Sequence, residues 1–119
     1  MRASSASSSA VVGNGFGKFV GSTQLAELGE LETPIALLCT LCVWRAAESV
    51  AKWMLAQPRM ERVRSINPVV GQTNDGWALN AIRTMPLTDA DVVSALTRAT
   101  TGRVAQGSVG AGKGKVAFG

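Results

Sequence analysis

The segment PIALLCTLCVWRAAESVAKWMLAQP, residues 34–58, sets the architecture of this chain because it joins an apolar run to a helical pattern. The apolar run over residues 35–41 predicts a strand that is buried on both faces. The pattern that follows predicts an α-helix over residues 40–57, and Pro58 ends it. The inner face of this helix carries apolar side chains at helical spacing, which are Val43, Ala47, Val50 and Met54.

Outward from this segment, the pattern predicts further short strands and one more helix. Gly-rich residues 11–22 indicate a short strand or a bent hairpin, and residues 67–71 indicate another strand or its edge. Residues 23–32 suit a strand or a helix. A second helix is predicted from the Thr-Asp-Ala-Asp of residues 88–91, which resembles a capping box, to a stop at Gly102. Strands mixed with helices in this way predict an α+β fold.

The chain has 119 residues, which suits one domain. Residues 1–10 are rich in Ser and Ala without apolar periodicity, so we expect a disordered tail followed by one domain over residues 11–119. No apolar segment follows the N-terminus as in a secretory signal, and the apolar run from Pro34 to Trp44 is too short to span a bilayer. We therefore expect a cytoplasmic protein without a membrane partner.

The composition excludes several classes of chemistry. The chain has no His, which rules out Ser-His-Asp catalysis and imidazole metal ligands within it, and its two Cys cannot build a Cys₄ zinc site. We expect no metal and no cofactor. The net charge is +4, but Lys and Arg form only short clusters and aromatic residues are few, so we expect no nucleic-acid partner.

Two short motifs come close to known functional patterns. GSVGAGKG at residues 107–114 resembles a phosphate-binding loop, but Gly114 stands where the loop needs a hydroxyl, so a Gly-rich turn is the better interpretation. Cys39-Thr40-Leu41-Cys42 is a C-x-x-C between a predicted strand and a predicted helix. This pair is either a thiol-redox site or two buried thiols that pack as small apolar side chains.

Four stretches in order resemble one family, the L-aminopeptidase/D-esterase family, which includes the β-peptidyl aminopeptidases. They are NGFGK at 14–18, LGELETPI at 28–35, NPVVGQTNDGW at 67–77 and GSVGAG at 107–112. The resemblance covers about residues 11–119, and the order and spacing of the stretches make it specific.

The resemblance implies an αββα sandwich, of which this chain would be a part of the α-chain. It also implies a precursor that cleaves itself before a Ser or Thr, which then serves as nucleophile, with its α-amino group available for catalysis. Substrates would be peptides or amides with a free N-terminus, and no metal is needed. The chain ends at Gly119, before the cleaved bond of the family, so we expect the nucleophile to lie on a β-chain partner and the isolated chain to be inactive.

The same resemblance indicates site residues. Asn80 lies in a stretch similar to a Leu-Asn-Asp-Ile pattern, with one extra residue before it, and is the candidate for stabilising the oxyanion. Asn14 and Lys18 lie on the stretch that lines the substrate pocket in the family. Lys18 stands where some members carry a Glu for the substrate ammonium, and a Lys would not serve that purpose.

Two alternatives to a self-processing aminopeptidase or amidase remain open from the sequence. One alternative is a non-catalytic, truncated relative that acts as a pairing subunit. The other is a small thiol-redox module that uses Cys39 and Cys42. We expect the isolated chain to self-associate, because strands of an incomplete sheet leave apolar surface uncovered.

Overall fold

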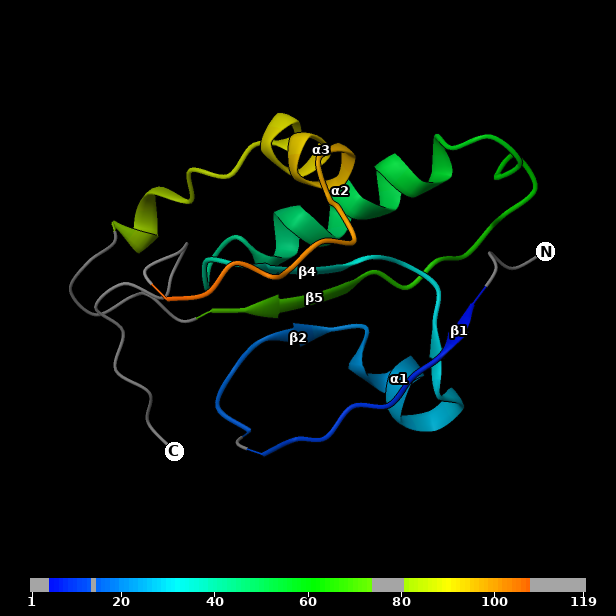
Figure 1. Ribbon diagram of the computed structural model, residues 1–119, viewed down its shortest axis with the longest axis horizontal. Coiled ribbons are helices and arrows are strands. Elements are labelled where there is room, and N and C mark those ends of the chain that lie inside the picture. Colours follow the sequence, from blue (N-terminus) through cyan, green and yellow to red (C-terminus); the bar gives the residue numbers. More distant parts are fainter. Residues whose placement is uncertain (1–4, 14, 74–80, 108–119) are drawn as a thin grey trace.

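The computed structural model describes residues 5–13, 15–73 and 81–107 (Figure 1). In chain order its elements are β1 (Ala6–Ser7), β2 (Phe19–Val20), α1 (Ser22–Leu28), β3 (Glu30–Leu31), β4 (Ile35–Leu38), α2 (Val43–Leu55), β5 (Val69–Gln72), the 3₁₀ helix η1 (Ile82–Thr84) and α3 (Asp89–Thr97). Helices and strands are mixed, in agreement with the predicted α+β class. Among these described helices, none has the length and apolar character that a membrane crossing requires.

The larger sheet has the strand order β2-β5-β4. β4 and β5 run parallel, with Ile35 opposite Val69 and Leu38 opposite Gln72, and β2 runs antiparallel to β5. A parallel pair needs a long crossover connection, and α2 supplies it. The strand predicted at residues 67–71 is therefore the central strand β5.

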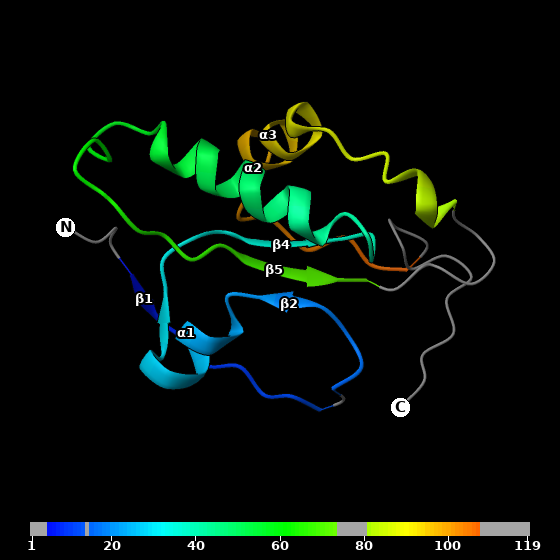
Figure 2. The same ribbon diagram turned by 180° about the vertical axis from the view of Figure 1, so that it is seen from behind.

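The core lies between this sheet and α2 (Figures 1 and 2). The predicted helix over residues 40–57 is confirmed as α2, which packs on one face of the sheet, and α3 packs against α2 on the same side. The buried side chains of this cluster are Val43, Ala46, Val50, Val70 and Val92. The capping box is also confirmed: Thr88 Oγ1 accepts from Asp91 N at 3.2 Å, and Thr88 N donates to Asp91 Oδ2 at 2.9 Å.

The prediction that residues 35–41 form a strand buried on both faces is wrong. β4 is an edge strand with alternating exposure, and Ile35 and Leu37 are 58% and 68% exposed. The alternate residues of the same strand, Ala36 and Leu38, lie on its other face and pack against the core. An apolar run indicates that burial is favourable, but it does not indicate which element provides it. Phe19, 41% exposed, belongs to the same open face because it pairs with Gly71, which pairs with Leu37.

The N-terminal part differs from the expected disordered tail at Ala6–Ser7. These two residues form β1 and pair antiparallel with β3, and Ser8 N donates to Gly29 O at 2.8 Å. Backbone pairing of this kind needs no apolar side chains, so composition does not reveal it. The ambiguous stretch over residues 23–32 contains both elements: α1 ends at Gly29, whose φ of 63° suits a glycine, and β3 follows.

Two buried polar residues fix the start of β5. Glu32, 7% exposed, accepts a hydrogen bond from Asn67 N at 2.7 Å, and Thr33, 6% exposed, accepts one from Val69 N at 3.0 Å. These bonds join two of the sequence stretches that carry the family resemblance. The start of β5 is therefore set by side chains from the turn that precedes β4.

Candidate active-site edge

The carboxyl ends of β4 and β5 lie together at one edge of the sheet, where β2 begins. Gln72 N donates to Lys18 O at 3.1 Å, and Thr73 donates to Leu38 O twice, from its backbone N at 2.8 Å and from Oγ1 at 3.1 Å. In open sheets with parallel strands, ligands bind outside the carboxyl ends of the strands. Lys18, Gln72, Thr73 and Leu38 form this end of the sheet, which we take as the candidate active site and name the active-site edge.

Lys18 is the predicted site residue that the structure describes. It is half-buried, and its Nζ donates to Gln72 Oε1 at 3.4 Å. An ammonium attracts carboxylates and carbonyl oxygens and repels a substrate ammonium. That a Lys here cannot replace a Glu stays a prediction. Gln72 was missed by sequence reasoning, although it lies inside the NPVVGQTNDGW stretch.

Asn14 and Asn80 lie outside the described residues, and so does Ser108. The chain leaves the active-site edge at Thr73 and returns to the described part at Ala81. Ala81 O accepts from Thr84 N at 2.9 Å and from Thr84 Oγ1 at 2.8 Å, which fixes the first turn of η1. The Gly-rich stretch over residues 107–114 is described only at Gly107.

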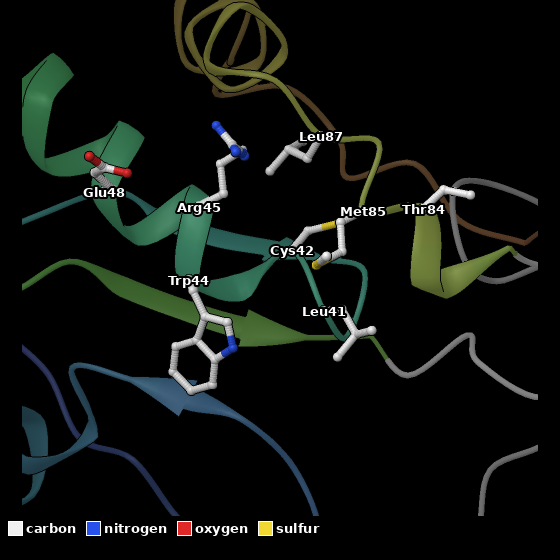
Figure 3. A pocket seen from close by; sticks show the side chains of 8 residues that line it. All are labelled: Leu41, Cys42, Trp44, Arg45, Glu48, Thr84, Met85 and Leu87. Atoms are coloured by element: carbon white, nitrogen blue, oxygen red, sulfur yellow. The ribbon is translucent and has the colours of Figure 1, made fainter.

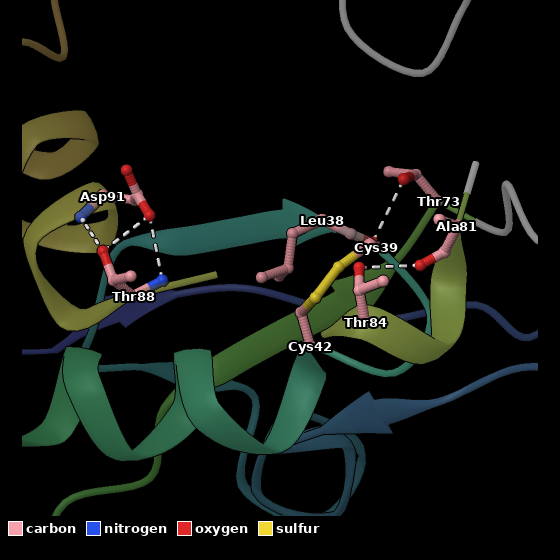
Figure 4. The surroundings of a disulfide bond; sticks show 8 residues. All are labelled: Leu38, Cys39, Cys42, Thr73, Ala81, Thr84, Thr88 and Asp91. Atoms are coloured by element: carbon pink, nitrogen blue, oxygen red, sulfur yellow. Dashed lines mark hydrogen bonds between the residues drawn. A yellow bond between two sulfur atoms is a disulfide. The ribbon is translucent and has the colours of Figure 1, made fainter. Parts of the chain in front are cut away.

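A disulfide joins Cys39 and Cys42 directly after β4 (Figure 4). The interpretation of this pair as two buried thiols is therefore wrong. Cys42, 1% exposed, is the residue before α2, whereas Cys39 is half-buried. Thr40 Oγ1, between them, is buried and has no hydrogen-bond partner among the described residues. The spacing of the two Cys was the sequence signal for this bridge.

A shallow hollow of about 480 Å³ lies beside the disulfide, at the start of α2 (Figure 3). It is lined by Leu41, Cys42, Trp44, Arg45, Glu48, Thr84, Met85 and Leu87. The charges of two lining residues are engaged elsewhere: Arg45 lies 3.8 Å from Asp89, and Glu48 lies 2.8 Å from Lys52. In the described part of the chain, no three Cys, Asp or Glu side chains gather as a metal ion would require.

The shifted pKa values lie at the α2–α3 contact and at the start of α3. The Ser49 hydroxyl donates to Asp89 at 2.7 Å and, with Lys52 and Arg45 nearby, holds the pKa of Asp89 below its ordinary value. Hydrogen bonds from Thr88 lower the pKa of Asp91, and Glu48 raises the pKa of Lys52. Asp89 and Lys52 lie at the contact between α2 and α3, and Asp91 caps α3. Their shifted pKa values therefore reflect the packing of the two helices.

Comparison with known proteins gives a consistent result. The sequence model of peptidase family S58 matches residues 1–119. The β-peptidyl aminopeptidase BapA of Sphingosinicella xenopeptidilytica is 36% identical over 106 residues, which is 88% of this chain and 26% of the relative. A solved β-aminopeptidase of Burkholderia sp. is 38% identical with a TM-score of 0.74, over 87% of this chain and 29% of that one. A solved protein of Pyrococcus horikoshii OT3 is 40% identical with a TM-score of 0.77, over 92% of this chain and 31% of that one. The chain thus spans between a quarter and a third of the length of these relatives.

Proposed function

This chain belongs to peptidase family S58, and from that premise we propose that it is part of a self-processing serine or threonine aminopeptidase or amidase. Its substrates are peptides or amides with a free N-terminus. The observation that carries the proposal is the active-site edge itself. There the NGFGK and NPVVGQTNDGW stretches are joined through Lys18 and Gln72, and Thr73 is anchored to β4.

The proposed nucleophile is a Ser or Thr outside these 119 residues, freed by self-cleavage. The chain has no His, so no imidazole within it can take the proton of a hydroxyl, and the α-amino group of the freed residue is the proposed base. Asn80 is proposed to donate its amide N–H to the oxyanion, a contribution of about 3 kcal/mol to the barrier. Asn14 and Lys18 are proposed to line the substrate side of the pocket.

The proposed partner is the β-chain that carries the nucleophile. Support comes from the open face of the main sheet, where Phe19, Ile35 and Leu37 are exposed together opposite the face that α2 covers. A second sheet packed on this face would complete the αββα sandwich. In the absence of such a partner, we propose that the same face drives self-association.

A second candidate function is that of a non-catalytic pairing subunit. Lys18 favours it, because its ammonium, held at 3.4 Å by Gln72, occupies a position where some family members place a carboxylate for the substrate ammonium. Such a chain would complete the sandwich with its partner without binding an N-terminal amine itself.

An aminoacyl-p-nitroanilide assay separates the two candidates. The purified chain is expected to be inactive alone and active after co-expression with a family β-chain. Asn80→Ala and Asn80→Asp are both expected to lower turnover by about 10²–10³-fold. Asn80→Asp keeps the shape of the side chain but lacks the N–H donor. Turnover by the chain alone that is lost in Ser108→Ala would contradict the proposed location of the nucleophile. A stable pair without turnover would favour the pairing subunit.

A further inference from the structure

The Cys39–Cys42 disulfide is built asymmetrically. The two Cα atoms are 5.3 Å apart, and Cys42 N donates to Cys39 O at 3.0 Å, so the turn between β4 and α2 is closed by the backbone as well as by the sulfurs. Cys42 is 1% exposed and Cys39 is half-buried. Cys39 is therefore the more exposed of the two residues, and an external reagent is expected to reach its sulfur first.

The position of Cys42 also favours it as the leaving group. It precedes the first residue of α2, a helix of 13 residues without an acidic residue in its first turn. The positive end of a helix stabilises a thiolate, and a thiol of lower pKa leaves faster in exchange. Arg45 also lies in the first turn and lines the hollow together with Cys42, although its charge is shared with Asp89 at 3.8 Å (Figure 3). Glu48, the acidic residue of that hollow, is paired with Lys52 at 2.8 Å.

Thr40 supplies a separate observation. Its hydroxyl lies in the turn that the disulfide closes and is buried, with no hydrogen-bond partner in the part of the chain that the structure describes. A buried polar atom of this kind costs free energy in the folded state. A thiolate formed in the same turn would be an acceptor for this hydroxyl.

We propose that Cys39 and Cys42 form a thiol–disulfide exchange site for small aliphatic thiols of the glutathione class. A thiolate of this class attacks Cys39 Sγ, the Cys39–Cys42 bond breaks, and Cys42 leaves as a thiolate that takes up a proton. A second small thiolate then attacks the mixed disulfide at the sulfur of the bound thiol, and Cys39 leaves as a thiolate. The protein disulfide gains two electrons, and two small thiols become one small disulfide. The small disulfide drives the same steps in reverse. The proposal is independent of the peptidase activity proposed above.

The test uses the full 119-residue chain and two single-cysteine variants, Cys42→Ala and Cys39→Ala. Each is incubated with oxidised glutathione under native conditions and in urea, and mixed disulfides are counted by mass spectrometry. We expect Cys42→Ala, which retains Cys39, to form the adduct at least about tenfold faster than Cys39→Ala in the native state, because access to the sulfur controls the rate. In urea the two rates should become similar. Equal native rates, faster reaction of the buried Cys42, or no native reaction at either residue would each overturn the proposal.

A measurement on the wild-type chain keeps the test valid if a variant does not fold. Reduced glutathione is added to the native protein, and free thiols are alkylated at intervals while circular dichroism follows the helical signal. We expect a mixed disulfide at Cys39 and an alkylated Cys42 to accumulate first, with the helical signal retained. Reduction that occurs only together with loss of the helical signal would overturn the proposal, because exchange would then require unfolding. Thr40→Val tests the hydroxyl as a donor to the thiolate. It is expected to slow the native reduction and to leave the rate in urea unchanged, and an unchanged native rate would contradict that role.

Discussion

Replacing Thr33 by Val tests how the start of β5 is fixed. The Thr33 hydroxyl accepts from Val69 N at 3.0 Å and donates to Pro34 O at 3.1 Å. Thr33 and Val69 are 6% and 2% exposed, so water cannot replace the lost acceptor. Val has nearly the shape of Thr, so the change removes the hydroxyl without opening a cavity.

The expected cost follows from the group that is left unpaired. A buried N–H without an acceptor costs about 1–3 kcal/mol, so Thr33→Val should lower the free energy of unfolding by that amount. Thr33→Ser is the matched control, because it keeps the hydroxyl and loses one methyl group. Its expected cost is about 0.8 kcal/mol.

Urea unfolding followed by circular dichroism measures both variants. The midpoint should fall further for Thr33→Val than for Thr33→Ser, with an unchanged slope, since neither variant alters the surface exposed on unfolding. A Thr33→Val midpoint equal to that of the wild type would refute the reasoning. It would mean that Val69 N finds another acceptor or that the turn before β4 does not hold β5.

Three further perturbations test the open sheet face, the α2–α3 contact and the turn before α1. Leu37→Lys should reduce self-association in gel filtration without loss of stability, because this side chain is 68% exposed on the open face. Asp89→Asn should destabilise the chain at neutral pH, where the carboxylate accepts a hydrogen bond from Ser49 and lies near Lys52 and Arg45. The pKa of Asp89 in the folded chain lies below the ordinary 3.8. The extra stability of the wild type is therefore present above pH 3.8 and is lost as the pH falls through the folded pKa. Gly21→Ala should cost more than about 1–2 kcal/mol in urea unfolding, since Gly21 has a φ of 82° and a Cβ there would meet Pro68 O.

Two of these changes have a control variant in the same chain, and the pH dependence checks the third. Val11→Lys adds the same charge at a residue that is 93% exposed outside the main sheet, so an equal effect on association would exclude the open face as its cause. For Asp89→Asn, a stability difference that stays constant down to strongly acidic pH would contradict the assigned pKa shift. Gly13→Ala meets nothing within 4 Å and should be tolerated; equal losses at both glycines would show that the backbone at Gly21 is not the cause.

Local patterns predicted two of the described helices, α2 and α3, and left α1 open. The spacing of apolar residues located α2, and the Thr-Asp-Ala-Asp sequence located the start of α3 at Thr88. Each of these two signals comes from residues that are close together in the chain, so it can be identified without knowing the fold. The predicted stop at Gly102 came too late because α3 ends at Thr97, where Thr-rich sequence of low helix propensity begins.

Long-range features were predicted less well. The pattern did not show that β4 lies at an edge, that Gln72 holds Lys18, or that Ala6–Ser7 pairs with β3. Each depends on which segments meet in space, which hydropathy does not encode. The resemblance supplied the motifs that meet at the active-site edge, while Asn14 and Asn80 remain predictions because they lie outside the described residues.

The position of β5 in the sheet has a consequence for synthesis on the ribosome. β5 pairs with β2 on one side and β4 on the other, yet it follows both in the chain. The segment between the end of β4 and the end of β5 takes roughly 2–7 s to synthesise at about 5–20 residues per second. During that interval β2 and β4 have been synthesised without the strand that joins them. α2 is complete at Leu55, before β5 exists, and is therefore the element that can first cover Ala36 and Leu38 in the nascent chain.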